Sequence, residues 1–163
     1  MTGDQFLSRC ELLDQMVIEA LREALLRETL IKLGVDQQDI IALKSLKLLV
    51  RILNLATIAA QAHLRILEDA TEILRREVEA RAQGLTVTDL PLLHHLHELR
   101  IMRGHKTETS RKGKMSDALA AMGVDQLSTA PGWGFALDAL YDGVASELEV
   151  GCSILRRALG RQS

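Results

Sequence analysis

The fold is decided by the stretch "IIALKSLKLLVRILNLATIAAQAHLRIL", residues 40–67. Its polar residues recur in steps of three or four, at Lys44, Lys47, Arg51, Asn54, Thr57, Gln61 and Arg65. The positions between them are nearly all apolar. Steps of three and four follow the period of an α-helix, so the polar residues form one narrow stripe. We therefore expect a helix that shows water only this stripe and is buried elsewhere.

The stripe continues past this stretch, through Glu68, Glu72, Arg75 and Glu79. We therefore predict one helix over residues 36–82, which would be roughly 70 Å long at 1.5 Å per residue. A compact domain of this size needs no helix of that length. The pattern thus predicts a long central spine helix that other helices, or a second copy of the chain, must cover. A homo-oligomer with coiled-coil packing is the corresponding expectation.

The sequence "KLGVDQQD", residues 32–39, predicts a tight turn between two helices. Gly34 suits the left-handed backbone position that follows a helix. Val35 can fold back onto the last helical turn, and Asp36 can cap the helix that comes next. We therefore predict that the first helix covers residues 4–32 and ends at this turn.

The second half of the chain carries similar signals. Thr88 or Asp89 can cap a helix that has Pro91 in its first turn, and Gly123 ends a short apolar helix. The predicted helices are residues 4–32, 36–82, 89–103, 116–122 and 133–159, with a loop over 104–114. We therefore predict an all-α fold, a single domain over residues 1–163. Its expected form is an elongated bundle of four main helices and one short helix.

Composition agrees with a helical core. Apolar residues make up 47 % of the 163 residues and aromatic ones only 2 %, which favours helices over a sandwich or a barrel. The longest uncharged run, residues 52–64, is shorter than the ~20 apolar residues of a membrane span. Cys10 and Cys152 lie in apolar contexts without a CxxC motif, and the first residues form no secretory signal. We therefore expect buried thiols and a cytoplasmic protein.

Positive charge is concentrated in residues 100–114, although the whole chain has a formal net charge of −2. The basic residues of this segment, which we take as candidates for binding an anion or a nucleic acid, are Arg100, Arg103, Lys106, Arg111, Lys112 and Lys114. A few phosphate contacts from such residues would give binding that is sensitive to salt and insensitive to base sequence. The alternative is a solvated loop, or a loop that binds the protein's own acidic surface.

The histidines near this segment raise the question of a metal site. His94, His97 and Glu98 are spaced so that a helix would bring two imidazoles and a carboxylate to one face, as an open metal site requires. The same side of the helix also carries leucine and isoleucine, so a half-buried pair of structural histidines explains the spacing equally well. The Glu-x-x-His pairs of diiron bundles do not occur. We predict no metal and no cofactor.

The sequence "RIMRGH", residues 100–105, resembles the R-x4-H motif of HEPN-type ribonucleases, in which paired helical bundles bring Arg and His together at a dimer interface to cleave RNA. The resemblance covers six residues. It implies that Arg100 would bind phosphate and that His105 would act as an acid or base, which is sensible chemistry for cleaving a phosphodiester. A ribonuclease is therefore one alternative function.

Three of the four aromatic residues form a cluster near a Gly-Pro turn: Trp133, Phe135 and Tyr141. Such an aromatic corner can cap the core or anchor a partner, because Trp and Tyr are prominent in binding hot spots. No G-x-S-x-G, phosphate-binding loop or dinucleotide motif occurs, so we predict no enzyme. The predicted function is a non-enzymatic cytoplasmic adaptor, chaperone or regulator that acts through helix-face contacts with proteins. An oligomeric nucleic-acid-binding protein that uses residues 100–114 is the main alternative.

Overall fold

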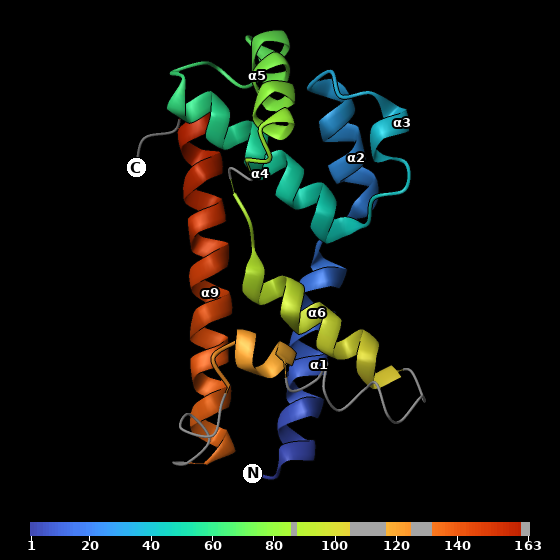
Figure 1. Ribbon diagram of the computed structural model, residues 1–163, viewed down its shortest axis with the longest axis vertical. Coiled ribbons are helices and arrows are strands. Elements are labelled where there is room, and N and C mark those ends of the chain that lie inside the picture. The colour runs from blue at the N-terminus through green and yellow to red at the C-terminus, as the bar shows by residue number, and fades with distance from the viewer. Residues whose placement is uncertain (86–87, 105–116, 125–131, 161–163) are drawn as a thin grey trace. The chain divides into compact units, whose positions relative to one another are not determined.

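The computed structural model describes residues 1–85, 88–104, 117–124 and 132–160. Every regular element in these ranges is a helix, which confirms the predicted all-α fold (Figure 1). The helices are α1 (Gly3–Ala20), α2 (Glu23–Lys32), α3 (Gln37–Ile40), α4 (Ser45–Gln61), α5 (Ala70–Ala82), α6 (Pro91–Gly104) and α9 (Trp133–Ala158), with a short helical stretch at 117–121. Within the same ranges, no helix is both long enough and apolar enough to cross a bilayer.

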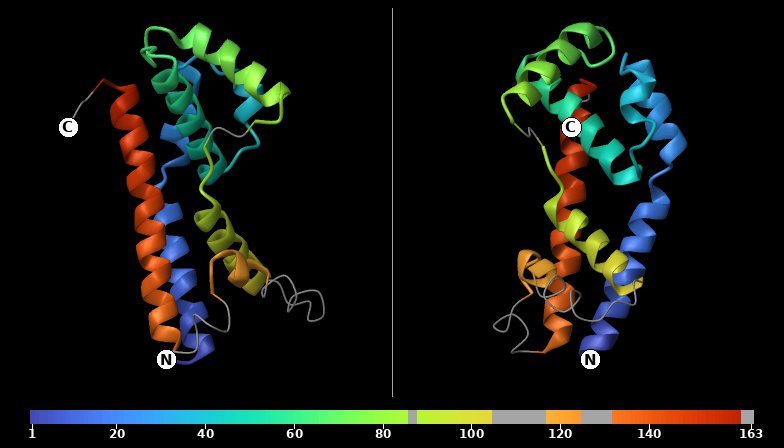
Figure 2. Two further views of the ribbon diagram at one scale, coloured as in Figure 1. Left: turned by 60° about the vertical axis from the view of Figure 1, so that its left-hand side comes forward. Right: turned by 45° about the vertical axis from the view of Figure 1, so that its right-hand side comes forward.

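The chain forms two compact units, each built from two separate stretches. The first unit comprises Met1–Glu19 and Leu90–Leu148. The second comprises Ala20–Asp89 and Glu149–Ser163. The helix α9 begins in the first unit and ends in the second, and it can be followed as one continuous helix in Figure 2.

In the second unit, α4 is the central helix, and both α2 and α5 pack against it. Buried apolar side chains occupy most of its circumference: Leu46, Leu48, Ile52, Leu53, Leu55, Ala56, Ile58 and Ala59. The end of α2 follows the sequence signals, because Gly34 is left-handed, with φ of 84°, and Val35 is buried. The carboxylate of Asp36 accepts a hydrogen bond from the backbone N–H of Gln38 and so caps α3. Local chemistry therefore fixes this turn as predicted.

The predicted spine helix over residues 36–82 is wrong, because the chain forms three helices there, α3, α4 and α5. The helix α4 ends where His63 takes a left-handed conformation, with φ of 54°. The backbone N–H of Leu64 then donates to the carbonyl of Ala59 at 2.8 Å. This hydrogen bond is typical of a helix end that normally uses glycine. A histidine in the glycine position hid the end of the helix from sequence analysis.

The polar stripe on α4 is only partly exposed to water, because the reversed chain covers some of its residues. Arg51, a member of the stripe, pairs with Glu77 of α5 through two contacts, Nε–Oε1 at 3.2 Å and Nη2–Oε2 at 3.4 Å. These side chains are only 10 % and 6 % exposed. Asn54 is partly buried as well, and its Oδ1 accepts a hydrogen bond from the backbone N–H of Thr88 at 2.6 Å. Part of the polar stripe therefore contacts another helix, through Arg51 and Glu77, although the sequence predicted that the whole stripe would face solvent.

Two shorter interruptions also depart from the prediction. Between α3 and α4, the Arg27 side chain donates to the carbonyls of Ile40 at 3.5 Å and Leu43 at 2.8 Å. It thereby satisfies carbonyl groups at a helix end. The predicted first helix, residues 4–32, is also wrong. The chain divides into α1 and α2 at Arg22, whose backbone is extended, with ψ of 95°. The two halves bury their apolar sides in different units, so their shared period does not require one helix.

In the first unit, contacts between side chains connect α1, α6 and the beginning of α9. The ring of Phe6 lies against that of Trp133, with 5.1 Å between the ring centroids. The Glu147 carboxylate accepts hydrogen bonds from the backbone N–H groups of Leu92 at 2.8 Å and Leu93 at 3.1 Å. Glu147 therefore caps α6 from α9. This contact from another helix was not predicted, and the predicted cap at Thr88 or Asp89 stays a prediction.

The remaining predicted helices agree closely with α6, the stretch at 117–121 and α9. The loop predicted over residues 104–114 lies almost wholly outside the described residues. Neither Cys10 nor Cys152 forms a disulfide within the described residues. The predicted burial is confirmed for Cys10 and is wrong for Cys152, which is exposed.

Candidate functional site

The most specific polar cluster of the first unit is centred on Asp14, a carboxylate on α1 that is 1 % exposed. The His97 Nδ1 lies 3.2 Å from each of its two oxygens, and the Arg100 Nη1 lies 3.1 Å from Oδ2. His97 and Arg100 are three residues apart on α6, so their side chains leave the same face of that helix. Two helices thus contribute to one cluster of three charged or ionisable groups.

This pairing explains how a carboxylate can lie in the interior. An ionised carboxylate that is buried without partners costs several kcal/mol, in the range of about 3–5 when a partner of a buried pair is removed. Asp14 has two partners, one of them the permanently charged guanidinium of Arg100. Because a carboxylate only accepts hydrogen bonds, Nδ1 of His97 must carry a proton when it faces Asp14. Asp14 therefore fixes both the orientation and the tautomer of the imidazole.

The outer side of the cluster is accessible to solvent. The side chains of His97 and Arg100 are each 35 % exposed. Within the described part of the chain, neither Nε2 of His97 nor Nε and Nη2 of Arg100 contacts another polar group. The Arg100 nitrogens can donate to an anion, whereas Nε2 of His97, which carries no proton in the tautomer that Asp14 fixes, can accept a hydrogen bond.

Of the residues predicted to bind anions, the structure places only Arg100 in this cluster. The side chain of Arg103, and the whole of Lys106, Arg111, Lys112 and Lys114, lie outside the described residues. His105 of the ribonuclease-like motif lies outside them too. Binding of nucleic acid by the basic loop and RNA cleavage by Arg100 with His105 therefore stay predictions.

The histidines of α6 do not gather as the metal hypothesis expected. His97 turns to Asp14, whereas the Glu98 Oε2 lies 3.3 Å from Nδ1 of His95. Among the described residues, no three His, Cys, Asp or Glu side chains lie together in a way that could hold a metal ion. The role of Asp14 was not predicted. Its position four residues after Cys10, on the buried side of α1, indicates that its carboxylate lies in the interior. An acidic residue in an apolar helix stripe requires a buried partner.

The residues of the predicted aromatic corner differ in their surroundings. Trp133 packs on Phe6 and belongs to the core contacts of the first unit. A Cβ atom built at Gly3 would lie 3.3 Å from the Trp133 ring, which shows how closely α1 approaches it. Phe135 and Tyr141 are exposed. Trp133 therefore contributes to the core contacts of the first unit, and Phe135 and Tyr141 are exposed aromatic side chains that can meet a partner.

A second candidate surface lies on the opposite side of α1 from Phe6, Cys10 and Asp14. Its members are Met1, Gln5, Ser8, Leu12 and Met16, spaced by steps of three or four, and we call them the outer α1 stripe. Leu12 and Met16 are 50 % and 71 % exposed. A shallow groove of about 590 Å³ runs along the first four members and is flanked by Asp4 and Arg9. The stripe thus has the spacing of a helix contact, and its apolar members Leu12 and Met16 remain exposed.

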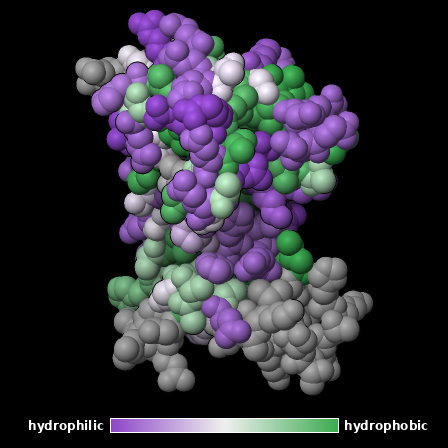
Figure 3. All heavy atoms as spheres, turned by 45° about the horizontal axis from the view of Figure 1, so that its top comes forward, coloured by the Kyte–Doolittle hydropathy of each residue, from purple (hydrophilic) through white to green (hydrophobic). Residues whose placement is uncertain are grey.

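Elsewhere, exposed apolar side chains are more scattered. The face drawn in Figure 3 is mostly hydrophilic, with separate hydrophobic side chains between the polar ones. Scattered apolar residues are normal on protein surfaces, whereas a run of them at helical spacing is informative.

No protein-family model, no curated protein and no solved structure matches the chain. The function is therefore inferred from the residues of the chain itself. They offer two chemically specific surfaces, the Asp14 cluster and the outer α1 stripe.

Proposed function

We propose that this chain is a non-enzymatic helical adaptor or regulatory protein of the cytoplasm that acts through helix-face contacts with proteins. Its first partner is a second copy of the same chain, bound through the outer α1 stripe. The observation that supports this is the exposure of Leu12 and Met16 on a helix whose opposite face is already buried.

The outer α1 stripe has the physical character of a helix–helix contact. Fully burying a Leu or Met side chain contributes about 1.5–3 kcal/mol, and a symmetric contact would bury each of these side chains twice. Met16 has an unbranched, flexible side chain, which adapts readily to a partner surface. Association would therefore remove from water the apolar groups that α1 leaves exposed.

The charges beside the stripe favour a second copy in parallel orientation. Asp4 and Arg9 lie on opposite flanks of the groove along α1. In a parallel helix pair, a residue on one flank meets the residue five positions further on the other flank of its partner. Asp4 of each copy would therefore face Arg9 of the other, which gives two symmetric ion pairs. An antiparallel pair would bring like flanks together.

The test is the absolute mass in solution, measured by light scattering over a dilution series. We expect the native chain to be a dimer that dissociates on dilution, and the double variant Leu12→Glu, Met16→Glu to be a monomer. The matched control is Val78→Glu on α5, which also replaces an exposed apolar residue and should leave the dimer intact. A native chain that is monomeric throughout the series contradicts the proposal.

The parallel orientation has a test of its own. Asp4→Arg should weaken the dimer, because it places two arginines face to face at each ion pair. The double variant Asp4→Arg, Arg9→Asp should restore it. If the double variant is as weak as the single one, the parallel arrangement is wrong even where a dimer forms.

A further inference from the structure

We infer that His97 and Arg100, held in place by Asp14, form a binding site for a phosphate group. The site is independent of the proposed self-association. Asp14 follows Leu12 by two positions, which places the two side chains on opposite sides of α1. A partner on the outer α1 stripe would therefore leave His97 and Arg100 accessible.

The first argument is the number of donors that the cluster leaves unused. The guanidinium of Arg100 has five N–H groups, and the contact with Asp14 at 3.1 Å engages only Nη1. The imidazole of His97 uses Nδ1 for Asp14 and keeps Nε2. Both side chains reach solvent from one face of α6, so the N–H groups of Arg100 and the acceptor Nε2 of His97 can converge on one ligand.

The second argument is that the donors are fixed before a ligand arrives. Long cationic side chains at a surface lose conformational entropy when they bind, which weakens the contact. Asp14 is buried and holds both the Arg100 and the His97 side chain. Much of this ordering therefore accompanies folding, and the ligand meets two groups that are already oriented.

The third argument concerns the chemistry of the ligand. The guanidinium fork matches two oxygens of a phosphate, and Nε2 of His97 can accept a hydrogen bond from the O–H of a third, protonated oxygen outside the guanidinium plane. The charges of Asp14 and Arg100 cancel, so the cluster has no excess negative charge to attract a cation. A metal cation would meet the positive charge of Arg100 next to the carboxylate. A tetrahedral oxyanion therefore suits the cluster better than a cation.

The experiment is an NMR titration of the full chain with inorganic phosphate, and separately with adenosine 5′-monophosphate, at constant ionic strength. We expect saturable shifts of the His97 ring and the Arg100 side-chain signals. Tighter binding of inorganic phosphate assigns the site to free phosphate, tighter binding of the nucleotide assigns it to an esterified phosphate, and equal affinity shows that the phosphate group alone is recognised. Titration with chloride alone should give no saturable shift.

Variants decide whether these residues are responsible. His97→Gln and Arg100→Lys should each weaken binding by about tenfold, the equivalent of one charge-assisted hydrogen bond. Arg100→Lys keeps a positive charge beside Asp14, so it tests the guanidinium fork in a chain that retains its fold. The matched control is His95→Gln on the same helix. The His95 side chain is 33 % exposed and pairs with exposed Glu98, and its loss should leave phosphate affinity unchanged.

The proposal is overturned if the native chain shows no saturable shift with either ligand. It is also overturned if His97→Gln and Arg100→Lys bind as tightly as the native chain, or if His95→Gln lowers the affinity as much as they do. Light scattering on the same variants separates this site from the dimer contact. We expect His97→Gln to remain as dimeric as the native chain.

Discussion

His63 is a single residue that determines where a helix ends. Its left-handed φ of 54° is a conformation that glycine adopts without a steric penalty and that most other residues avoid. We predict that His63→Gly raises the free energy of unfolding by about 0.5–1 kcal/mol, measured by urea denaturation. His63→Ala keeps the penalty and should give no gain. Equal effects of the two changes would show that the backbone conformation is not the cause.

Glu77 is a residue whose loss should be costly. Its carboxylate pairs with Arg51, and both side chains are almost fully buried. Glu77→Ala leaves the guanidinium without its closest partner, so we predict a loss of about 3 kcal/mol in the free energy of unfolding. Asp39, at 3.5 Å from Arg51, is exposed and cannot replace it fully.

Two controls accompany this prediction. Glu79→Ala, on the exposed side of the same helix, should have a much smaller effect. The double change Arg51→Met, Glu77→Leu should recover most of the lost stability, because it removes both buried charges. A double variant that is no more stable than Glu77→Ala would mean that packing, and not the unpaired charge, sets the cost.

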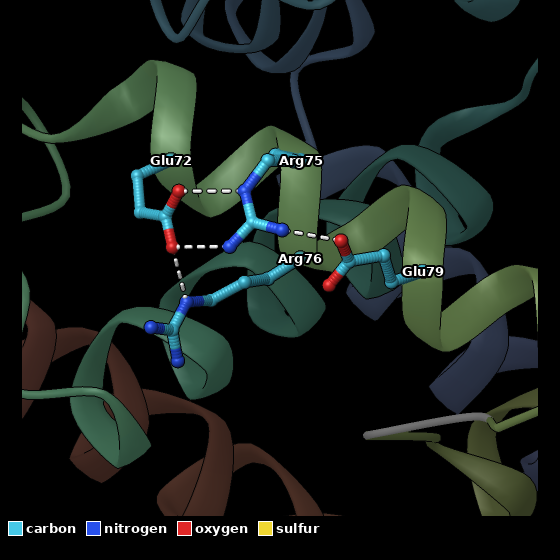
Figure 4. A network of polar contacts seen from close by, with 4 residues as sticks. All are labelled: Glu72, Arg75, Arg76 and Glu79. Carbon is cyan, nitrogen blue, oxygen red and sulfur yellow. Dashed lines mark hydrogen bonds and ion pairs between the residues drawn. The ribbon is translucent and has the colours of Figure 1, made fainter.

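The helix α5 carries an exposed network of charges along its surface, drawn in Figure 4. The Glu72 carboxylate accepts hydrogen bonds from Arg75 and Arg76, and Arg75 also contacts Glu79. These hydrogen bonds lower the pKa of Glu72 from 4.5 to about 2. The carboxylate is therefore more acidic in the folded chain than in the unfolded one.

The sign of the resulting pH dependence follows directly. A lowered pKa in the folded state stabilises the fold above the unfolded pKa, and the contribution disappears as pH falls through the folded pKa. We predict that Glu72→Gln lowers stability at neutral pH, and that this loss shrinks as pH falls from 4.5 toward 2 and is absent well below pH 2. Denaturation at several pH values checks this. Because the group is exposed, high salt should shrink the difference, and a difference that persists at the lowest pH would contradict the assignment.

The helix α6 depends on a cap from a different helix. Glu147 of α9 accepts hydrogen bonds from the backbone N–H groups of Leu92 and Leu93. We predict that Glu147→Ala lowers the free energy of unfolding by about 1 kcal/mol, the usual value of a helix cap. Glu149→Ala, an exposed change on the same helix, should be nearly neutral. Similar losses from both changes would argue against the capping role.

Helix ends show how far sequence reasoning reaches. The turn at Gly34, Val35 and Asp36 was predictable, because neighbouring residues supply its hydrogen bonds. The end of α3 was not, since its carbonyls are satisfied by Arg27, which lies on another helix. The helical period showed which residues of α4 and α5 share a face. It could not show that the polar faces of these two helices contact each other.

The candidate site was predictable to a similar degree. The spacing of His97 and Arg100 already places them on one face of a helix. Their partner Asp14 is more than eighty residues away in sequence, and no local pattern indicates which helix packs against α6. The sequence therefore predicted that His97 and Arg100 share one face of α6, but it did not predict their contact with Asp14.

For the whole chain, self-association should be visible in thermal stability. A partner that binds only the folded chain stabilises it by mass action, so the melting temperature of a dimer rises with protein concentration. We predict such a rise for the native chain and a constant melting temperature for Leu12→Glu, Met16→Glu, measured by calorimetry. Parallel curves for the two proteins would contradict the role of the outer α1 stripe.

The division of α9 between two units has a consequence for synthesis on the ribosome. The N-terminal half of α9 supplies Trp133 to Phe6 in the first unit, and its C-terminal half brings Gly151 against Leu53 in the second. Both α1 and α4 leave the ribosome long before α9 is made. Each then exposes apolar surface that chaperones or proteases can recognise during translation. The nascent chain therefore completes both cores only after α9 has been made, because that helix contributes to each of them.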